Sequence, residues 1–417
     1  MIYARIHCVI KYLCAITIFI ICPHISAAQQ RASDFVYGIH LHQAKNFEQL
    51  NHKGFSAIRL WDSYTSWRDV QPYSAQYKLD NITAVLQASQ SLGMKATLVL
   101  GSTPQWASSR PTERCSYGYG CAAEPANLAD WRRYVKVISN TYRGQIECYE
   151  PWNEVSFPNE PVFKRDDGGE AGQFYSGSIN GLVEIAKVTF EEVKKADPSA
   201  CVLSPSFHSS GDWIKKLDQY LIAGGGKYMD AVSFHFYFGD EPEESVRNIR
   251  AVKAVLKKHG MDDIQIWNSE IGIPFFEKKS IFNGVVYEDM VYALVLRTYI
   301  VNMAEDIPRL YWYSWDNNNL GLNAGSLNGQ VAGEAIVSAL RLIGTRRKVS
   351  CITSQGVWQC DLTGSDGKLR VLWATRDAKP AAPIKLQKGG WYWGARREYI
   401  DAGALVTPSF RPIIINW

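Results

Sequence analysis

The sequence predicts an α/β fold, a closed (β/α)8 TIM barrel followed by a small all-β domain. Short apolar, β-branched segments alternate with longer amphipathic segments between residues 35 and 344. This alternation favours parallel strands joined by helical crossovers. Eight strand segments over about 310 residues match the size of a closed barrel. After residue 345 the helical pattern stops, and apolar and polar residues alternate with a period of two.

Each predicted strand is a run of six to eight residues rich in apolar and aromatic side chains, and the eight runs cover 35–42, 55–61, 95–101, 146–152, 201–206, 230–237, 264–270 and 309–315. The predicted helices keep apolar residues three and four positions apart. They cover 80–93, 128–142, 179–198, 244–260, 287–308 and 333–344. An open doubly wound sheet is the alternative, but no Gly-x-Gly-x-x-Gly motif follows the first strand.

The first 28 residues have the features of a signal peptide. Arg5 and Lys11 supply positive charge, the apolar run "YLCAITIFIIC" is short for a membrane span, and "SAA" at 26–28 offers a cleavage site. We therefore expect a secreted or periplasmic protein without stable membrane insertion after cleavage. An uncleaved anchor in the inner membrane, facing the periplasm, is the alternative. The remaining chain divides into a predicted catalytic barrel, 29–344, and a β-sandwich-like domain, 345–417.

Charge and cysteine content restrict the function further. Two of the 45 basic residues and none of the 41 acidic residues lie in the signal segment, so the rest of the chain is nearly neutral. This balance argues against a nucleic-acid partner, whereas the oligomeric state is not readable. The short spacings predict two disulfides, Cys115–Cys121 and Cys351–Cys360. Cys148 and Cys201 lie in apolar runs and are expected to be buried thiols. A zinc site is the alternative for the six cysteines that follow residue 28, but no Cys-x-x-Cys or paired His spacing supports it.

Polar and aromatic side chains gather at the C-terminal ends of the predicted strands, where barrels keep their reactive groups. The gathered residues are His40, His42, Arg59, Trp61, Trp106, Asn153, Glu154, His208, His235, Tyr237, Glu270 and Trp315. Two are carboxylates, Glu154 after the fourth strand and Glu270 after the seventh. Two carboxylates facing one cavity suit glycoside hydrolysis, in which one donates a proton and the other stays ionised. An arginine beside the ionised carboxylate lowers its pKa.

Four motifs carry a family resemblance. "EPWNE" at 150–154 and "IWNSEIG" at 266–272 resemble the acid/base and nucleophile motifs of clan A retaining glycoside hydrolases. With "GFSAIRLWDSYTSWRDVQP" and "LVLGSTPQWAS", the chain is most similar to glycoside hydrolase family 39 and the related glycosidases of bacterial exopolysaccharide operons. The resemblance covers about residues 35–345 and implies a barrel fold.

The resemblance also implies a role for individual residues. Glu154 would be the acid/base, Glu270 the nucleophile, and Arg59 the residue that steadies the nucleophile. The expected substrate contacts are Arg59, Asn153, His235, Tyr237, Trp315, Trp106 and His42, with Asn153 on the hydroxyl next to the anomeric carbon and Trp315 as an aromatic floor. One departure concerns Val155, which stands where the family usually has proline and leaves the acceptor-side loop in doubt. No metal and no cofactor are expected.

The expected function is retaining hydrolysis of an oligo- or polysaccharide, with an exopolysaccharide and endo action preferred, whereas the sugar and linkage are not readable. Glu150 lies inside its strand, and we expect it in a buried hydrogen-bond network. The alternative function is a non-catalytic glycan-binding or scaffold protein of a polysaccharide system, which has no physical need for two carboxylates and their arginine. A metalloenzyme would need a grouped His/Asp ligand set, which the sequence lacks.

Overall fold

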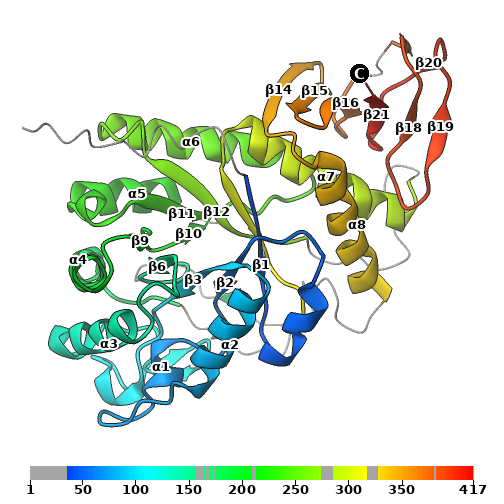
Figure 1. Ribbon diagram of the computed structural model, residues 1–417. Coiled ribbons are helices and arrows are strands. Elements are labelled where there is room, and N and C mark those ends of the chain that lie inside the picture. The colour runs from blue at the N-terminus through cyan, green and yellow to red at the C-terminus, as the bar shows by residue number, and fades with distance from the viewer. Residues whose placement is uncertain are drawn as a thin grey trace, which may run out of the picture. The chain divides into compact units, whose positions relative to one another are not determined.

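A closed parallel barrel forms the body of the protein (Figure 1). Its strands are β1 (Val36–His40), β2 (Ala57–Leu60), β3 (Lys95–Val99), β6 (Cys148–Glu150), β9 (Cys201–Val202), β10 (Phe207–His208), β11 (Ala231–His235), β12 (Gln265–Ile271) and β13 (Arg309–Trp312). They are ordered β10-β11-β12-β13-β1-β2-β3-β6-β9. A parallel bridge between Leu203 and Ala231 joins the two ends of this series, so β9 and β10 together act as the fifth barrel strand. The predicted fold class is confirmed.

The computed structural model describes residues 35–155, 163–164, 170–171, 174–208, 213–273, 285–316, 327–379 and 382–416. The predicted signal peptide lies outside these residues. Residues 33–417 make up one compact unit. Within the described parts, no helix is long and apolar enough to cross a bilayer.

Helices surround the strands on the outside of the barrel (Figure 1). They are α1 (Trp67–Val70), α2 (Asp80–Ser91), α3 (Leu128–Thr141), α4 (Ile179–Ala196), α5 (Trp213–Ile222), α6 (Glu244–Lys258), α7 (Tyr287–Ala304) and α8 (Leu327–Ile343), with 3-10 turns at η2 (Ala44–Leu50), η3 (Gln105–Ala107) and η4 (Gly225–Tyr228). All six predicted helices are present. Helix α5 was not predicted, because ten residues are too few to establish a 3.6-residue period.

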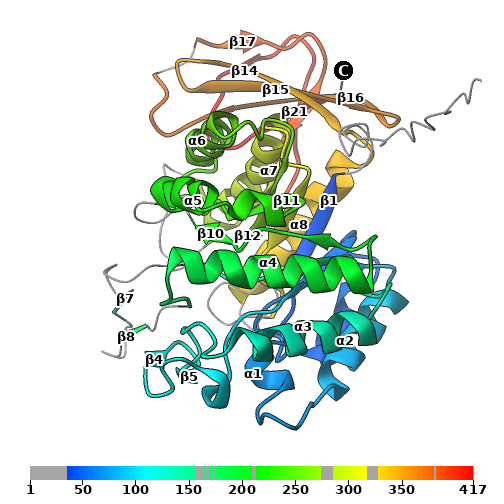
Figure 2. The same ribbon diagram turned by 90° about the vertical axis from the view of Figure 1, so that its left-hand side faces the viewer.

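The chain after α8 forms antiparallel sheets that pack on one side of the barrel (Figure 2). One sheet has the order β14-β15-β16-β21-β18-β19, built from β14 (Lys348–Ser354), β15 (Val357–Gly364), β16 (Gly367–Ala374), β18 (Gly390–Tyr392), β19 (Glu398–Ile400) and β21 (Ile413–Asn416). A separate pair consists of β17 (Ile384–Lys385) and β20 (Leu405–Val406). Leu372, Leu386 and Val406 pack between the two sheets. The predicted all-β architecture of this region is confirmed.

Helix α7 packs against both the barrel and the C-terminal sheets. Its residues Tyr287 and Asp289–Met303 are all buried, which is expected for a helix covered on every face and explains its lack of a polar side. Trp393 donates its indole N–H to the Tyr292 carbonyl at 2.8 Å. The buried Arg297 pairs with Glu241 at 2.7 Å and with Glu243, and Trp373 donates to Glu243 at 2.7 Å. The C-terminal sheet therefore completes the packing of the barrel.

The described residues contain three disulfides, one more than predicted. Cys115–Cys121 and Cys351–Cys360 close the two short loops that the spacings predict. The expectation that Cys148 and Cys201 are free thiols is wrong, because these residues form the third disulfide. They face each other in the register of β6 and β9, with Cα atoms 4.5 Å apart. A sequence separation of 53 conceals this proximity, which only the closed barrel creates.

The third disulfide should contribute more stability than the short ones. In the loop-entropy account, closing a loop of this length stabilises by about 4 kcal/mol, against about 2.6 kcal/mol for Cys351–Cys360. We expect Cys148→Ala/Cys201→Ala to lower the free energy of unfolding more than Cys351→Ala/Cys360→Ala does, as measured by urea unfolding. Peptide mapping without reductant checks the bonds directly. Free thiols at 148 and 201 would contradict the assignment.

Candidate active site

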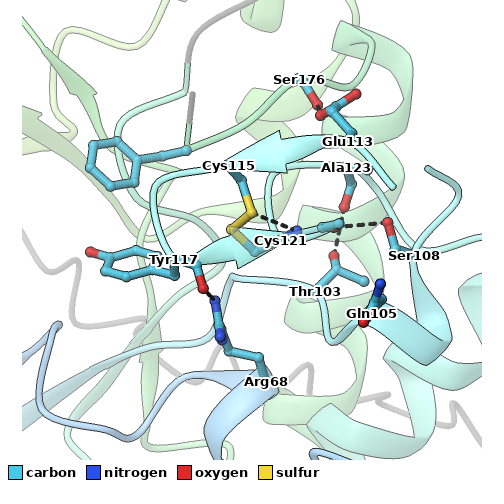
Figure 3. Close-up of a disulfide and its surroundings, with 12 residues drawn as sticks. Arg68, Thr103, Gln105, Ser108, Glu113, Cys115, Tyr117, Cys121, Ala123 and Ser176 are labelled. Atoms are coloured by element: carbon cyan, nitrogen blue, oxygen red, sulfur yellow. Dashed lines mark hydrogen bonds between the residues drawn. A yellow bond between two sulfur atoms is a disulfide. The ribbon is translucent and has the colours of Figure 1, made fainter. Parts of the chain in front are cut away.

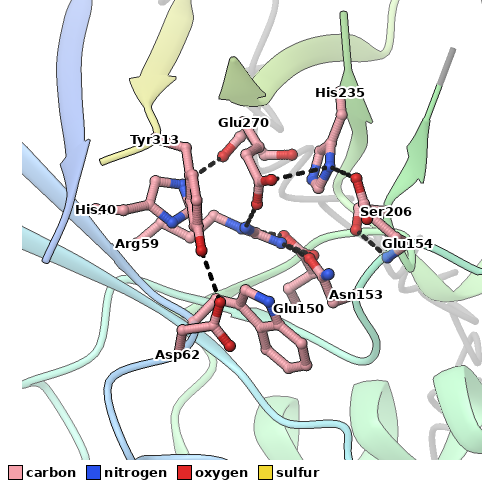
Figure 4. Close-up of polar contacts among 12 residues, drawn as sticks. His40, Arg59, Asp62, Glu150, Asn153, Glu154, Ser206, His235, Glu270 and Tyr313 are labelled. Atoms are coloured by element: carbon pink, nitrogen blue, oxygen red, sulfur yellow. Dashed lines mark hydrogen bonds and ion pairs between the residues drawn. The ribbon is translucent and has the colours of Figure 1, made fainter. Parts of the chain in front are cut away.

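Arg59 lies at the centre of the barrel mouth and is fully buried (Figure 4). Its guanidinium donates to both Glu150 oxygens, at 3.0 and 2.5 Å. It also donates to Glu270 at 2.9 Å and to the Asn153 side-chain oxygen at 2.7 Å. Glu150 accepts a further bond from Ser233 at 3.0 Å and so belongs to the buried network that its place inside the strand suggests. One guanidinium therefore joins strands β2, β6 and β12.

Glu270 ends up buried on β12 with two strong donors. Arg59 bonds one carboxylate oxygen, and the Tyr237 hydroxyl donates to the other at 3.0 Å. Burial raises the pKa of Glu270 to about 7, and the nearby Glu154 carboxylate acts in the same direction, whereas His235 and Arg59 oppose the shift. The two donors stabilise the ionised form of this carboxyl.

Glu154 follows β6 in a left-handed backbone conformation, with φ of 39°. Non-glycine residues seldom adopt this region, and such strain is concentrated at functional sites. The Glu154 amide donates to the Ser206 hydroxyl at 2.9 Å, and a carboxylate oxygen lies 2.8 Å from Nδ1 of His235. Burial raises the pKa of Glu154. Burial also lowers the pKa of His235 to about 4, so this imidazole is neutral near pH 7.

The two carboxyls are neighbours. One oxygen of each lies within 4.8 Å of the other, and His235 Nδ1 is 3.9 Å from Glu270. Two carboxylates at this separation disfavour double ionisation. Because Arg59 and Tyr237 donate to Glu270, we place the negative charge on Glu270 and the shared proton on Glu154. This division leaves one carboxyl protonated and the other ionised.

Glu154, His235 and Glu270 could also offer one ligand atom each to a metal ion. The sequence did not reveal this grouping, because the three residues come from different strands. Arg59 lies 2.9 Å from the Glu270 carboxylate, and its positive charge opposes a second cation there. The absence of a metal remains a prediction.

Other predicted contacts occupy different parts of the mouth. The ring of His42 lies 5.3 Å from that of Tyr313 at the rim. His208 lies near enough to Glu154 to affect its pKa. Trp106 is half-buried, donates to the Gln71 carbonyl at 3.0 Å and packs edge-on against Trp67. None of the described hydrogen bonds or ring contacts links Trp106 to the carboxylates.

Trp315, predicted as the aromatic floor, is placed elsewhere. It is 4% exposed, donates its indole N–H to Gln49 at 3.0 Å, and packs edge-on against Phe55. Tyr313 lies at the site instead, with its ring 5.1 Å from that of His40 and its hydroxyl donating to Asp62 at 2.8 Å. Tyr313 and Asp62 were not among the predicted site residues. Strand β13 ends at Trp312, so simple alternation could not show which aromatic residue beyond it faces the mouth.

Comparison with solved structures places the fold among glycoside hydrolases. A family 39 glycoside hydrolase from Bacteroides cellulosilyticus WH2 has a TM-score of 0.67 at 17% identity, covering 92% of this chain and 81% of that chain. A family 39 β-xylosidase from Caulobacter crescentus has a TM-score of 0.61 at 15% identity, covering 93% and 97%. A family 30 endoxylanase from Clostridium papyrosolvens C71 has a TM-score of 0.57 at 12% identity, covering 93% and 97%.

These structural neighbours are clan A glycoside hydrolases, as the sequence motifs suggested. At such low identities the comparison shows a shared fold alone. No protein-family model matches the sequence, and no curated protein does.

Replacing Trp315 tests its packing role. Because the side chain is 4% exposed, Trp315→Ala should lower the free energy of unfolding by about 3–5 kcal/mol. Glycan affinity of the folded variant should change little, as titration calorimetry below its melting temperature would measure. A large loss of glycan affinity at an unchanged free energy of unfolding would instead support Trp315 as a sugar platform.

The buried carboxyl of Glu270 should lower the free energy of unfolding at high pH. Because the folded pKa of Glu270, about 7, exceeds the ordinary 4.5, ionising this group on raising the pH destabilises the fold. Glu270→Gln should therefore raise the free energy of unfolding at pH 8 by up to about 3 kcal/mol. The gain should shrink as the pH falls toward 5, as urea unfolding at both pH values would measure.

Glu147→Gln is the matched control. Burial opposes ionisation of Glu147, but hydrogen bonds from Arg309 and Lys95 outweigh it and lower the pKa of this carboxyl. Its stabilising effect is present near neutral pH and is lost on acidification, so this variant should be less stable than wild type at pH 8. Equal effects of both substitutions would contradict the assigned shifts.

Proposed function

We propose that the protein is a retaining O-glycoside hydrolase acting on an oligo- or polysaccharide by double displacement. The observation that carries the proposal is the pair Glu154 and Glu270, with carboxylate oxygens within 4.8 Å of each other. Retaining enzymes hold their two carboxyl groups about 5–5.5 Å apart, whereas inverting enzymes need about 6.5–9.5 Å to admit a water. The Arg59 contact to Glu270 and the His235 contact to Glu154 favour different roles for the two.

In the first step, a carboxylate oxygen of Glu270 attacks the anomeric carbon. The bond from this carbon to the glycosidic oxygen breaks, and the proton on Glu154 moves to that oxygen, so the leaving sugar departs as an alcohol. The negative charge of Glu270 is consumed as the covalent bond forms. Arg59 and Tyr237 hold the attacking carboxylate in position, because each donates to one of its oxygens.

In the second step, Glu154 is ionised and accepts a proton from water. That water attacks the anomeric carbon from the vacated side, and the bond to Glu270 breaks. Two inversions give net retention. His235, with Nδ1 2.8 Å from Glu154, can donate to the ionised carboxylate or accept from the protonated one, which suits a residue that alternates between the two forms.

Asn153 is proposed to bind the hydroxyl next to the reacting carbon. Its side-chain oxygen accepts from Arg59 at 2.7 Å, so its amide hydrogens are the groups left for a ligand. The structural neighbours include a β-xylosidase, an endoxylanase and a glucosidase from Croceicoccus marinus. We propose a polysaccharide substrate, an exopolysaccharide by preference, with endo cleavage. No cofactor takes part in this mechanism.

We also propose that the protein works outside the cytoplasm. Three disulfides support this location, because such bonds persist in oxidising compartments. The signal-like first 28 residues point the same way.

Removing each carboxylate separately tests the mechanism. Glu270→Ala should lose at least about 10⁴-fold in kcat on every substrate, because no nucleophile remains. Glu154→Ala should keep activity on aryl glycosides with good leaving groups, which need no proton, and azide should restore turnover by replacing water as the attacking group. An NMR time course should show the retained anomer as first product.

The same experiment addresses the alternative of a glycan-binding protein without turnover. A panel of bacterial and plant polysaccharides, with products sized by mass spectrometry, should yield shorter chains with wild type and none with Glu270→Ala. Binding without any cleavage by wild type would favour the scaffold alternative. An inverted first product would contradict the assignment of Glu270 as nucleophile.

A further inference from the structure

Asp62 is a carboxylate at the barrel mouth that takes no part in the two steps of the proposed hydrolysis. It follows β2 with a left-handed φ of 59°, a strained conformation for a residue with a side chain. Tyr313 donates its hydroxyl to one carboxylate oxygen at 2.8 Å, and Tyr117 donates to the other. Burial, reinforced by the charge of Asp62, raises the pKa of both tyrosines, so both remain donors. Each carboxylate oxygen keeps an acceptor site for a further partner.

The Tyr117 hydroxyl that donates to Asp62 belongs to a hairpin. A disulfide closes this hairpin (Figure 3). The hairpin pairs β4 (Arg114–Cys115) with β5 (Gly118–Tyr119), and Cys121 completes the bond to Cys115. Arg68 donates to the Tyr117 carbonyl, and the Tyr117 ring meets Trp61 edge-on at 5.7 Å.

The base of this hairpin is also fixed. Ser108 donates to the Gly120 carbonyl at 2.8 Å, and Ser176 donates to Glu113. The disulfide and these bonds hold the Tyr117 hydroxyl where Asp62 needs a donor, although Tyr117 is 36% exposed.

The sheet order shows which part of a substrate Asp62 faces. Asp62 and Tyr313 follow β2 and β13, which flank β1. Glu154 follows β6, and its partner His235 ends β11, on the opposite side of the closed barrel. Figure 4 shows Asp62 and Tyr313 across Arg59 from Glu154 and His235. The leaving sugar departs toward the acid Glu154, so Asp62 lies beside the sugar that stays on Glu270.

The charges near Asp62 restrict the chemical class of the donor-side sugar. In the described part of the mouth, the Arg59 guanidinium already pairs with Glu150 and Glu270. Among the described residues no cation forms an ion pair with Asp62. A uronate on the donor side would meet this carboxylate and be repelled, whereas a hydroxyl or a protonated amine would bind it.

We propose that Asp62, positioned by Tyr313 and by Tyr117 of the disulfide hairpin, binds hydroxyl or amino groups of the donor-side sugar and excludes uronates. The substrate class is therefore a glycan whose cleaved residue is a neutral or amino sugar. This inference rests on the proposed glycosidase function and deepens it. The strained backbone and the two tyrosine donors serve to hold a hydrogen-bond acceptor in the donor subsite.

Aryl glycosides isolate the donor side, because their leaving group is not a sugar. Wild type should hydrolyse neutral or amino-sugar aryl glycosides from a panel that includes glucoside, galactoside, mannoside, xyloside, glucosaminide and glucuronide. Asp62→Asn keeps the size and removes the charge. We expect its kcat/KM for the best neutral or amino substrate to fall at least tenfold, and the ratio of glucuronide to that substrate to rise at least tenfold.

Two hairpin variants provide the matched comparison. Tyr117→Phe removes one donor to Asp62 and should shift the same ratio in the same direction by a smaller factor. Tyr119→Phe lies two residues along the hairpin, is 54% exposed, and should leave the ratio unchanged. Thermal melts confirm that each variant is folded. An unchanged ratio in both Asp62→Asn and Tyr117→Phe overturns the proposal.

The outcomes separate this inference from the function on which it rests. If wild type binds glycans without hydrolysing any glycoside, the proposed function fails. The same preference is then measured as Kd for neutral, amino and uronate oligosaccharides, and a tenfold shift in Asp62→Asn supports the donor subsite. If wild type neither cleaves nor binds any member of the panel, both proposals are overturned.

Discussion

The burial of the Arg59 guanidinium is the constraint on which the rest of the site depends. A fully buried charge costs several kcal/mol in lost hydration unless neighbouring groups satisfy it. Here Glu150 takes two of its donors, while Glu270 and the Asn153 amide take others. These partners come from β6, the segment after it, and β12, so satisfying one side chain fixes three parts of the barrel relative to one another. Glu270, the proposed nucleophile, and Asn153, the proposed hydroxyl ligand, are held in place by the same requirement.

The same constraint makes Glu270 and Glu154 differ in how readily they ionise. Glu270 has direct donors from Arg59 and Tyr237, whereas Glu154 lies on a strained residue beside a neutral imidazole. Burial raises the pKa of both, but the donors around Glu270 favour its anion and leave the proton to Glu154. Two side chains of the same type thus differ in how readily they ionise because their surroundings differ. The strain at Glu154 is tolerated because the barrel strands on both sides determine its position.

The sequence predicted the parts of this structure that depend on local pattern. All eight strand segments and six helices follow from apolar periodicity, and the positions of Glu154 and Glu270 follow from where those strands end. The missed features depend on distance in space. Cys148 and Cys201 meet only because β6 and β9 are adjacent, and Asp62 gains its two tyrosines from a hairpin 55 residues away and a strand end 251 residues away. Trp315 and Tyr313 are separated by one residue, and only the backbone path after β13 decides which enters the mouth.

The contacts between α7 and the C-terminal sheet have a consequence for the biosynthesis of the protein. Helix α7 is buried on every face, and part of its cover comes from Trp393 and Ala395, far toward the end of the chain. A nascent chain that has emerged only as far as α8 would leave exposed the part of this helix that Trp393 and Ala395 contact. The barrel therefore cannot complete its core during most of its own translation. The burial of α7 is completed only when the last strands of the C-terminal sheet are in place.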